Sequence, residues 1–134
     1  METALTLPLL LLVSVSIFEF GRAYQTWQIL TNAAREGARL AILPDSTVSD
    51  VQARVSAYMQ NGQLPDYASA TIAVDQNQTI DIGTGTASAS LVTVSYPFSF
   101  MVLNPVVQLV SRGSTLGGSA LTLTATAEMR NEAQ

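Results

Sequence analysis

The 134-residue sequence predicts an α+β fold, in which one long N-terminal helix packs on a small, mostly antiparallel β-sheet with one additional helix. Three observations indicate this class. Helical spacing of like residues continues from about residue 3 to residue 42 without a Gly-Pro break, and a second helical pattern covers residues 46–62. Several later segments alternate apolar and hydroxyl side chains, as half-buried strands do. We therefore expect a helix at 1–43 and a globular head at 44–134.

The first part of the long helix is strongly apolar. The stretch "ALTLPLLLLVSVSIF" (Ala4–Phe18) is almost entirely apolar or small. A membrane span needs about 20 apolar residues, and this run reaches that length only if Glu19 is included. A secretory signal peptide is the other interpretation, but it would want a basic segment before the run, where the only charge is Glu2. The run is competent to enter a membrane, and its pattern is not that of a permanent anchor.

The second part of the helix is amphipathic. One side carries a seam that is aromatic at one end and small at the other: Phe20, Tyr24, Trp27, Thr31, Ala34, Ala38 and Ala41. Gly37 costs a helix interior about 1 kcal/mol relative to alanine, which indicates a close packing contact. We expect the head to dock on the Trp27 side of this seam. The whole helix would be ~60 Å long at 1.5 Å per residue, so part of it must protrude into lipid or into other subunits.

Glu19 is the one charged residue among large apolar neighbours. A lone carboxylate beside Phe18 and Phe20 is costly unless it is paired. Arg22, one helical turn on, is the local partner, and an arginine of another subunit is the alternative. The aromatic residues of this helix are interpreted as packing residues and not as an electron-transfer path.

The head is expected to begin with the helix at 46–62, capped by Ser46, Thr47 or Ser49 and ended by Gly62. Three or four strands should follow. They are predicted at 68–75, before a turn at 76–78; at 79–86, running into a Gly/Thr turn; at 89–98; and at 120–129. Between the last two, we expect a loop and short helix at 99–111, where Asn-Pro breaks the apolar run, and a flexible loop at 112–119.

Composition excludes several classes of function. The chain has no cysteine and no histidine, so disulfides, thiolate metal sites and the commonest general base are absent. A net charge of −4 leaves no broad cationic surface, and we expect no nucleic-acid partner. The aspartates show no calcium-loop spacing. We therefore predict no enzyme activity, no catalytic residue, no metal and no cofactor. Asn77 begins an Asn-Gln-Thr pattern that fits a glycosylation site.

Three stretches resemble the TadE-like proteins, a pilin-like family of the tight-adherence (Flp-type) pilus systems. They are "METALTLPLLLLVSVSIFEFGRA" at residues 1–23, "LTNAAREGARLA" at Leu30–Ala41, and "VTVSYPFSF" with "LTLTATAEMRNE" towards the C-terminus. The resemblance implies a type IV pilin-like fold with a protruding N-terminal helix. Precursors in such systems usually carry a basic leader that ends in glycine. Here Glu2 stands almost first, so either the sequence starts near the mature end or processing differs.

The resemblance also implies a function. The chain would be a structural subunit of an extracellular pilus-like filament, polymerised with itself through its N-terminal helix after residing in the inner membrane with the pilus assembly machinery. The alternatives are a minor pilin-like protein that primes or caps a Tad-type pilus, and a membrane-tethered monomeric binding head. The residues expected in the helical assembly core are Glu2, Leu7, Leu11, Phe18, Glu19, Phe20, Arg22, Tyr24, Trp27, Ala34, Gly37 and Ala38.

Overall fold

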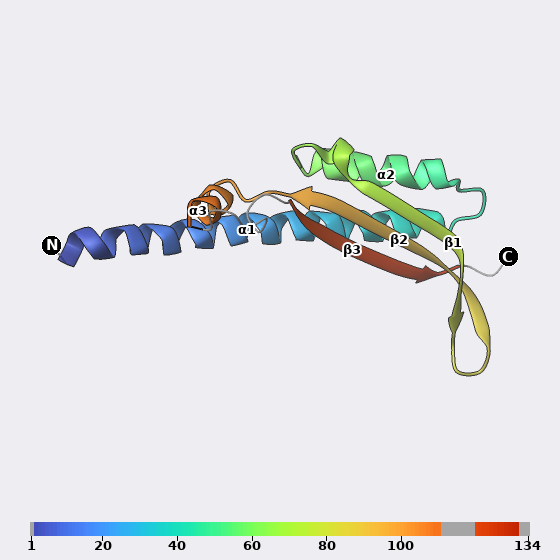
Figure 1. The fold of residues 1–134 in the computed structure, drawn as a ribbon. Coiled ribbons are helices and arrows are strands. Elements are labelled where there is room, and N and C mark those ends of the chain that lie inside the picture. Colours follow the sequence, from blue (N-terminus) through green and yellow to red (C-terminus); the bar gives the residue numbers. More distant parts are fainter. Residues whose placement is uncertain (1, 111–119, 132–134) are drawn as a thin grey trace. The chain divides into compact units, whose positions relative to one another are not determined.

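The computed structural model describes the backbone of residues 2–110 and 120–131, and the side chains of residues 3–106 and 120–131 (Figure 1). The elements are three α-helices, α1 (Glu2–Ala41), α2 (Val48–Asn61) and α3 (Leu103–Val110), a short 3-10 turn at Tyr67–Ser69, and three strands, β1 (Thr71–Asp81), β2 (Thr86–Phe98) and β3 (Leu121–Arg130). The chain divides into two compact units. One comprises residues 1–25 with 97–121, and the other residues 26–96 with 122–134. The predicted α+β class, with a long N-terminal helix packed on an antiparallel sheet, is confirmed.

α1 is continuous from Glu2 to Ala41, as the sequence predicts. In its apolar part, hydroxyl groups are satisfied within the helix: Ser14 Oγ donates to Leu10 O at 2.9 Å, and Ser16 Oγ donates to Leu12 O at 2.7 Å. These serines therefore add little polarity to the apolar helix. The helix ends just before Pro44, and Asp45 follows with a left-handed φ of 69°.

The second unit has its core where the C-terminal half of α1 meets α2 and the sheet. The residues that are completely buried are Leu30, Ala33, Ala34, Ala38, Val51, Val55, Met59, Ala89, Val92 and Val94. Gly37 stands at the closest approach, since an ideal Cβ placed there would lie 2.5 Å from Val55 Cγ2 and 3.3 Å from Val92 Cγ1. The close contact predicted for Gly37 therefore lies within the chain, with α2 on one side and β2 on another.

α2 (Val48–Asn61) lies within the predicted range of 46–62 and is flanked by two of the predicted end residues, Thr47 and Gly62. Of the three predicted caps, Thr47 is the one used: its hydroxyl accepts from Asp50 N at 3.2 Å, and Asp50 Oδ2 accepts from Thr47 N at 3.1 Å. Gly62 ends the helix and donates to Tyr58 O at 3.0 Å. A Cβ at Gly62 would lie 2.8 Å from Ile29 Cγ2. This contact gives Ile29 a packing partner at the end of α2.

The three strands form one sheet in the order β1-β2-β3, with β1 and β2 antiparallel. The predicted turn at 76–78 and the break between two strands are wrong, because β1 runs through this segment. Its register shifts between Asp75, opposite Leu91, and Gln78, opposite Ala89, so one extra residue is accommodated as a bulge. Cross-strand hydroxyl pairs Thr93–Thr126 at 3.3 Å and Ser95–Thr124 at 3.4 Å join β2 to β3.

The segment after β2 forms α3, as predicted for 99–111, so α2 and α3 accompany α1 in the part of the chain that is described. The expectation that Asn-Pro breaks this segment is wrong. Pro105 lies in the first turn of α3, where a backbone N–H has no partner within the helix and its loss costs little. The loop predicted at 112–119 lies outside the described residues.

Candidate functional site

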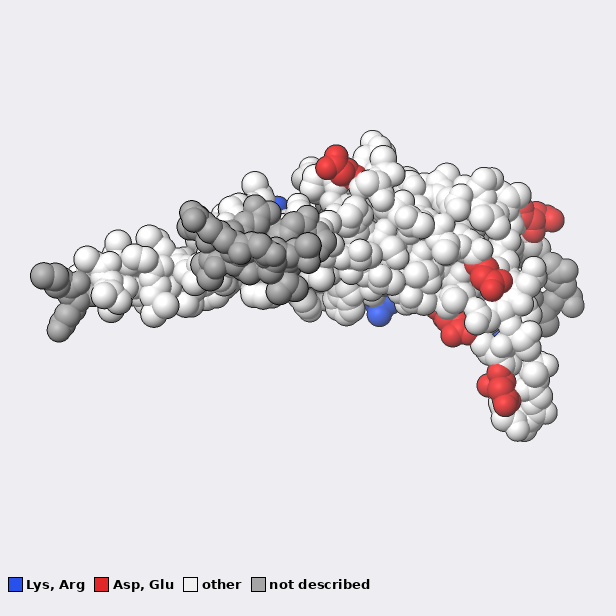
Figure 2. Space-filling view, viewed as in Figure 1, with Lys and Arg blue, Asp and Glu red and all other residues white. Residues whose placement is uncertain are grey.

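The N-terminal part of α1 exposes an apolar surface that the described residues leave largely uncovered. Residues 3–18 contain no charged residue. Their large apolar side chains are solvent-exposed, up to 81% for Leu5 and 80% for Phe18. This end of α1 carries no charged side chain among the described residues seen in Figure 2. By length and composition, α1 is able to cross a membrane.

An ion pair, Glu19 with Arg22, lies at the C-terminal end of this apolar surface and binds the loop that follows β2. The carboxylate of Glu19, only 6% exposed, accepts a hydrogen bond from the backbone N–H of Met101 at 2.8 Å. Arg22 lies 3.7 Å from the same oxygen and donates from Nη2 to Ser99 O at 2.6 Å. Two side chains one turn apart on α1 therefore hold both ends of the stretch Ser99–Met101. The predicted pairing of Glu19 with Arg22 is confirmed.

Aromatic rings pack around this pair. The Arg22 guanidinium stands 4.9 Å from the centre of the Phe98 ring. Its buried Nε has no hydrogen-bond acceptor among the described residues, as suits a guanidinium stacked over a ring face. Phe100 makes edge-to-face contacts with Phe98, at 5.2 Å between ring centres, and with Phe20, at 5.8 Å. The loop is thus attached to α1 by two hydrogen bonds and ring packing, and the ion pair joins the two α1 side chains that make those hydrogen bonds.

Apart from Glu19 and Arg22, which form the ion pair described above, the described residues predicted for assembly fall into two groups. Those in the apolar part of α1 and the aromatic part of the seam are exposed: Leu7, Leu11, Phe18, Phe20, Tyr24 and Trp27. Ala34, Gly37 and Ala38 are instead buried in the core of the second unit, so they contribute to the fold of the chain itself. The side chain of Glu2 lies outside the described part. Asn77 is exposed on β1, where its glycosylation stays a prediction.

The predicted docking through the seam is wrong for the ring of Trp27, whereas the alanine end of the seam, Ala34, Ala38 and Ala41, is buried. Trp27 is 42% exposed, whereas Thr26 and Leu30 are buried. At ~100° per residue, the centre of the buried face of α1 lies roughly 60° from Trp27. Small side chains select this face, because they allow α1 to approach α2 and the sheet closely, and the bulky ring of Trp27 is left at the edge.

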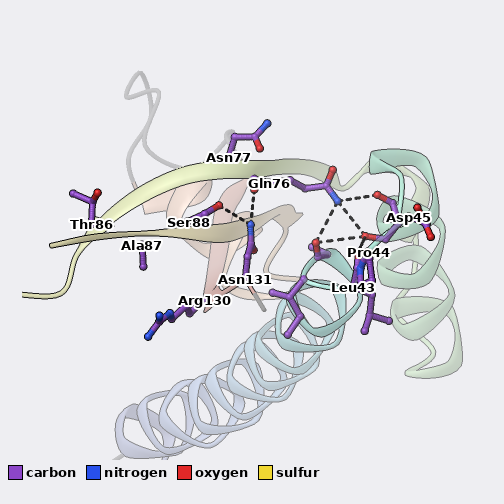
Figure 3. Close-up of a pocket in the computed structure, with 13 residues that line it drawn as sticks. Leu43, Pro44, Asp45, Gln76, Asn77, Thr86, Ala87, Ser88, Arg130 and Asn131 are labelled. Carbon is purple, nitrogen blue, oxygen red and sulfur yellow. Dashed lines mark hydrogen bonds between the residues drawn. The ribbon is translucent and has the colours of Figure 1, made fainter. Parts of the chain in front are cut away.

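A hollow at the C-terminal end of α1 holds a polar network that the sequence did not predict (Figure 3). Gln76 Nε2 donates to Ser46 O at 3.1 Å. Asn131 donates from Nδ2 to Gln76 O at 3.0 Å and to Ser88 Oγ at 2.8 Å, and its Oδ1 accepts from Ser90 Oγ at 2.7 Å. The polar groups of this network satisfy one another's hydrogen bonds. We therefore interpret the network as structural, because it joins β1, β2 and the residue after β3. It also gives the bulge in β1 its physical reason, since it directs the Gln76 side chain towards the end of α1.

The comparisons with known proteins concern the same helix. Neither the curated proteins nor the solved structures contain a match to this chain. A family model, that of the TadE-like proteins, matches residues 1–39. The match therefore includes Met1 and all of α1 except its last two residues. The family that the sequence motifs resemble is therefore confirmed over the N-terminal helix, and the match identifies this region as TadE-like.

Proposed function

We propose that this protein is a structural subunit of an extracellular pilus-like filament and polymerises through the N-terminal part of α1. The observation that carries the proposal is the uncovered apolar surface of residues 3–20. The TadE-like match over the same helix supports an association with a Tad-type pilus.

The exposed apolar surface of α1 is large. Ten large apolar side chains between residues 5 and 20 are exposed: Leu5, Leu7, Leu9, Leu10, Leu11, Leu12, Val13, Ile17, Phe18 and Phe20. Complete burial of each contributes about 1.5–3 kcal/mol, so their burial together contributes roughly 15–30 kcal/mol as an upper estimate. A surface of this size requires either lipid or other protein chains around it. Before assembly the inner membrane provides that cover, and afterwards neighbouring copies do.

The polymer is expected to be a filament, because identical chains would all use the N-terminal part of α1 for their contacts. A helix that packs on different faces of its neighbours makes heterologous contacts, and a rotation that does not close produces a filament and not a ring. The assembly machinery of the pilus would supply the transfer from lipid to filament. Enzyme activity forms no part of this proposal.

The experiment is electron microscopy of sheared cell-surface material, with mass identification of the main band. A structural subunit dominates this fraction and forms filaments. A minor protein that primes or caps the pilus would be nearly absent from it while filaments persist. A membrane-tethered monomer would remain in the inner membrane and form no high-mass species.

A matched pair of variants tests the helix itself. Leu11→Arg places an unpaired charge in the assembled core, at a cost of several kcal/mol per subunit. Thr84→Arg places the same charge at the exposed tip between β1 and β2. We expect filaments to be lost with Leu11→Arg and kept with Thr84→Arg, at matched membrane levels of the two variants. Normal filaments from Leu11→Arg would contradict the proposal.

A further inference from the structure

The loop Ser99–Val102 extends the apolar surface of α1. Met101 is 69% exposed and Val102 is 43% exposed, in the same unit as the exposed side chains of Ile17, Phe18 and Phe20. The backbone of Met101 is bound to Glu19, so these two apolar side chains belong beside the helix at the level of residue 19. Together with the helix they form one exposed apolar patch, and large patches of this kind mark contacts with other proteins or with membranes.

The charges of the attachment are paired with each other and bound to the backbone of the loop. Glu19 is buried, and its oxygen is used by Met101 N–H and Arg22. Arg22 is directed to the carbonyl of Ser99 and to the ring of Phe98. The pairing neutralises two charges that would otherwise oppose contact of this level of α1 with an apolar medium.

The position along the helix matches the edge of a bilayer. From residue 3 to residue 20 the helix rises ~26 Å at 1.5 Å per residue, close to the ~30 Å hydrocarbon thickness of a membrane. The loop is held at the end of this length, where acyl chains give way to headgroups. Apolar side chains at this depth insert a few ångströms into the leaflet, as those of interfacial elements do.

We propose that Ser99–Val102 is a second membrane-inserting element, which seats in the leaflet from which α1 emerges and is held there by Glu19 and Arg22. Its occupant is the lipid bilayer. The inference deepens the proposed function, because it rests on residence of α1 in the membrane before assembly. It adds that the chain contacts lipid at two points of its sequence that are 82 residues apart.

The test uses the full chain reconstituted in vesicles of phosphatidylethanolamine and phosphatidylglycerol at a ratio of 3:1. The sequence has no cysteine, so single replacements can each carry one nitroxide spin label. Collision with oxygen, which concentrates in lipid, is compared with collision with a water-soluble nickel chelate. The labelled variants are Met101→Cys, Leu11→Cys as the lipid reference, and Leu43→Cys as the matched control. Leu43 is also an exposed apolar residue, at 48%, but it follows the charged turns at the end of α1.

We expect the Met101→Cys label to collide with nickel several-fold less often than the Leu43→Cys label, and with oxygen at a rate between those of the other two. Equal nickel collision rates for Met101→Cys and Leu43→Cys, with Leu11→Cys protected, would overturn the inference alone. Lack of protection at Leu11→Cys would instead overturn membrane residence, and with it both proposals.

The attachment is tested in the same vesicles by changing Glu19 in the Met101→Cys background. Glu19→Gln keeps an oxygen that accepts from Met101 N–H, whereas Glu19→Leu removes every acceptor and leaves the helix more apolar. Nickel collision at the label should stay low with Glu19→Gln and rise several-fold with Glu19→Leu. An unchanged rate with Glu19→Leu would show that Glu19 does not hold the loop in the leaflet. A comparable rise with both variants would assign the seating to the charge of Glu19 and contradict the hydrogen-bond argument.

Discussion

Replacement of Gly37 by alanine tests whether the C-terminal half of α1 is reserved for the chain's own core. An ideal Cβ at this position lies 2.5 Å from Val55 Cγ2, 3.3 Å from Val92 Cγ1 and 3.5 Å from Val51 Cγ1. Carbon atoms pack best at about 3.5–4.0 Å, so the first contact is roughly an ångström too short. Either Val55 must change its rotamer or α1 and α2 must move apart.

The change in stability caused by Gly37→Ala is the sum of two opposed effects. Overpacking a core of this kind costs about 1–3 kcal/mol, and removal of a glycine from a helix interior gains about 1 kcal/mol. The net effect is a loss of about 1 kcal/mol, within a range of roughly 0–2 kcal/mol. A loss of 1 kcal/mol lowers the melting temperature of a small domain by about 4–8 °C.

Gly21→Ala is the matched control, because it lies in the same helix and a Cβ there meets no atom within 4 Å. It should leave the melting temperature unchanged or raise it. The assay is thermal unfolding of the full chain in mild detergent, followed by circular dichroism.

A second substitution separates the clash from other causes. Val55→Ala removes the atom nearest to the new Cβ, so the Gly37→Ala change should cost less in this background. The coupling energy expected for directly contacting residues is about 0.5–3 kcal/mol. If Gly37→Ala instead raised the melting temperature as Gly21→Ala does, and showed no coupling to Val55, residue 37 would not face α2. It would then be free for contacts with other subunits.

Three further predictions concern the second unit. Leu30→Ala should lower the free energy of unfolding by about 2–5 kcal/mol, as for a fully buried leucine. Trp27→Ala should cost less than half of that, because Trp27 is 42% exposed. Equal losses of stability in thermal melts would show that the ring is part of the core. Asn131→Ala should cost about 1–3 kcal/mol in the same assay, since it leaves the polar network around it unsatisfied; a loss below a few tenths would show that the network adds nothing. The hydrogen bond from Thr47 holds the pKa of Asp50 below its usual 3.8, so the stability that Asp50 adds is complete above that value and is lost as the pH falls through the lower folded-state pKa. The melting temperatures of wild type and Asp50→Ala should therefore converge below about pH 4, and a gap that is constant with pH would contradict this assignment.

Features determined by local sequence were predicted well. The limits of α1 and α2 follow from helical spacing, from Thr47 as a cap and from Gly62 as a stop, all of which act within a few residues. The strand at 76–78 was missed because Gln-Asn-Gln has the composition of a turn. Pairing with β2 and the network around Asn131 override that local preference, and neither is visible within a short window of sequence.

The orientation of α1 and the partners of Glu19 required information from distant residues. The sequence favoured the aromatic seam as the docking face, on the assumption that the largest side chains are the most buried. The structure buries the smaller ones, since closeness of approach and not side-chain size decides where α1 meets α2 and β2. The Met101 N–H that binds Glu19 is 82 residues away, and a backbone donor carries no signature in the sequence.

The two halves of α1 differ in side-chain size because they meet different surroundings. Between Leu30 and Ala41, small residues face α2 and β2, and larger substitutions on this face should unfold the second unit. Between residues 5 and 20, large side chains are exposed, and in the proposed function lipid or a neighbouring copy would accommodate bulk but not charge there. Substitutions in the two halves should therefore produce separable defects, loss of folding in one and loss of membrane residence and assembly in the other. The loop at Ser99–Val102 belongs to the second class, although it lies far along the sequence, because Glu19 and Arg22 fix it to the apolar half.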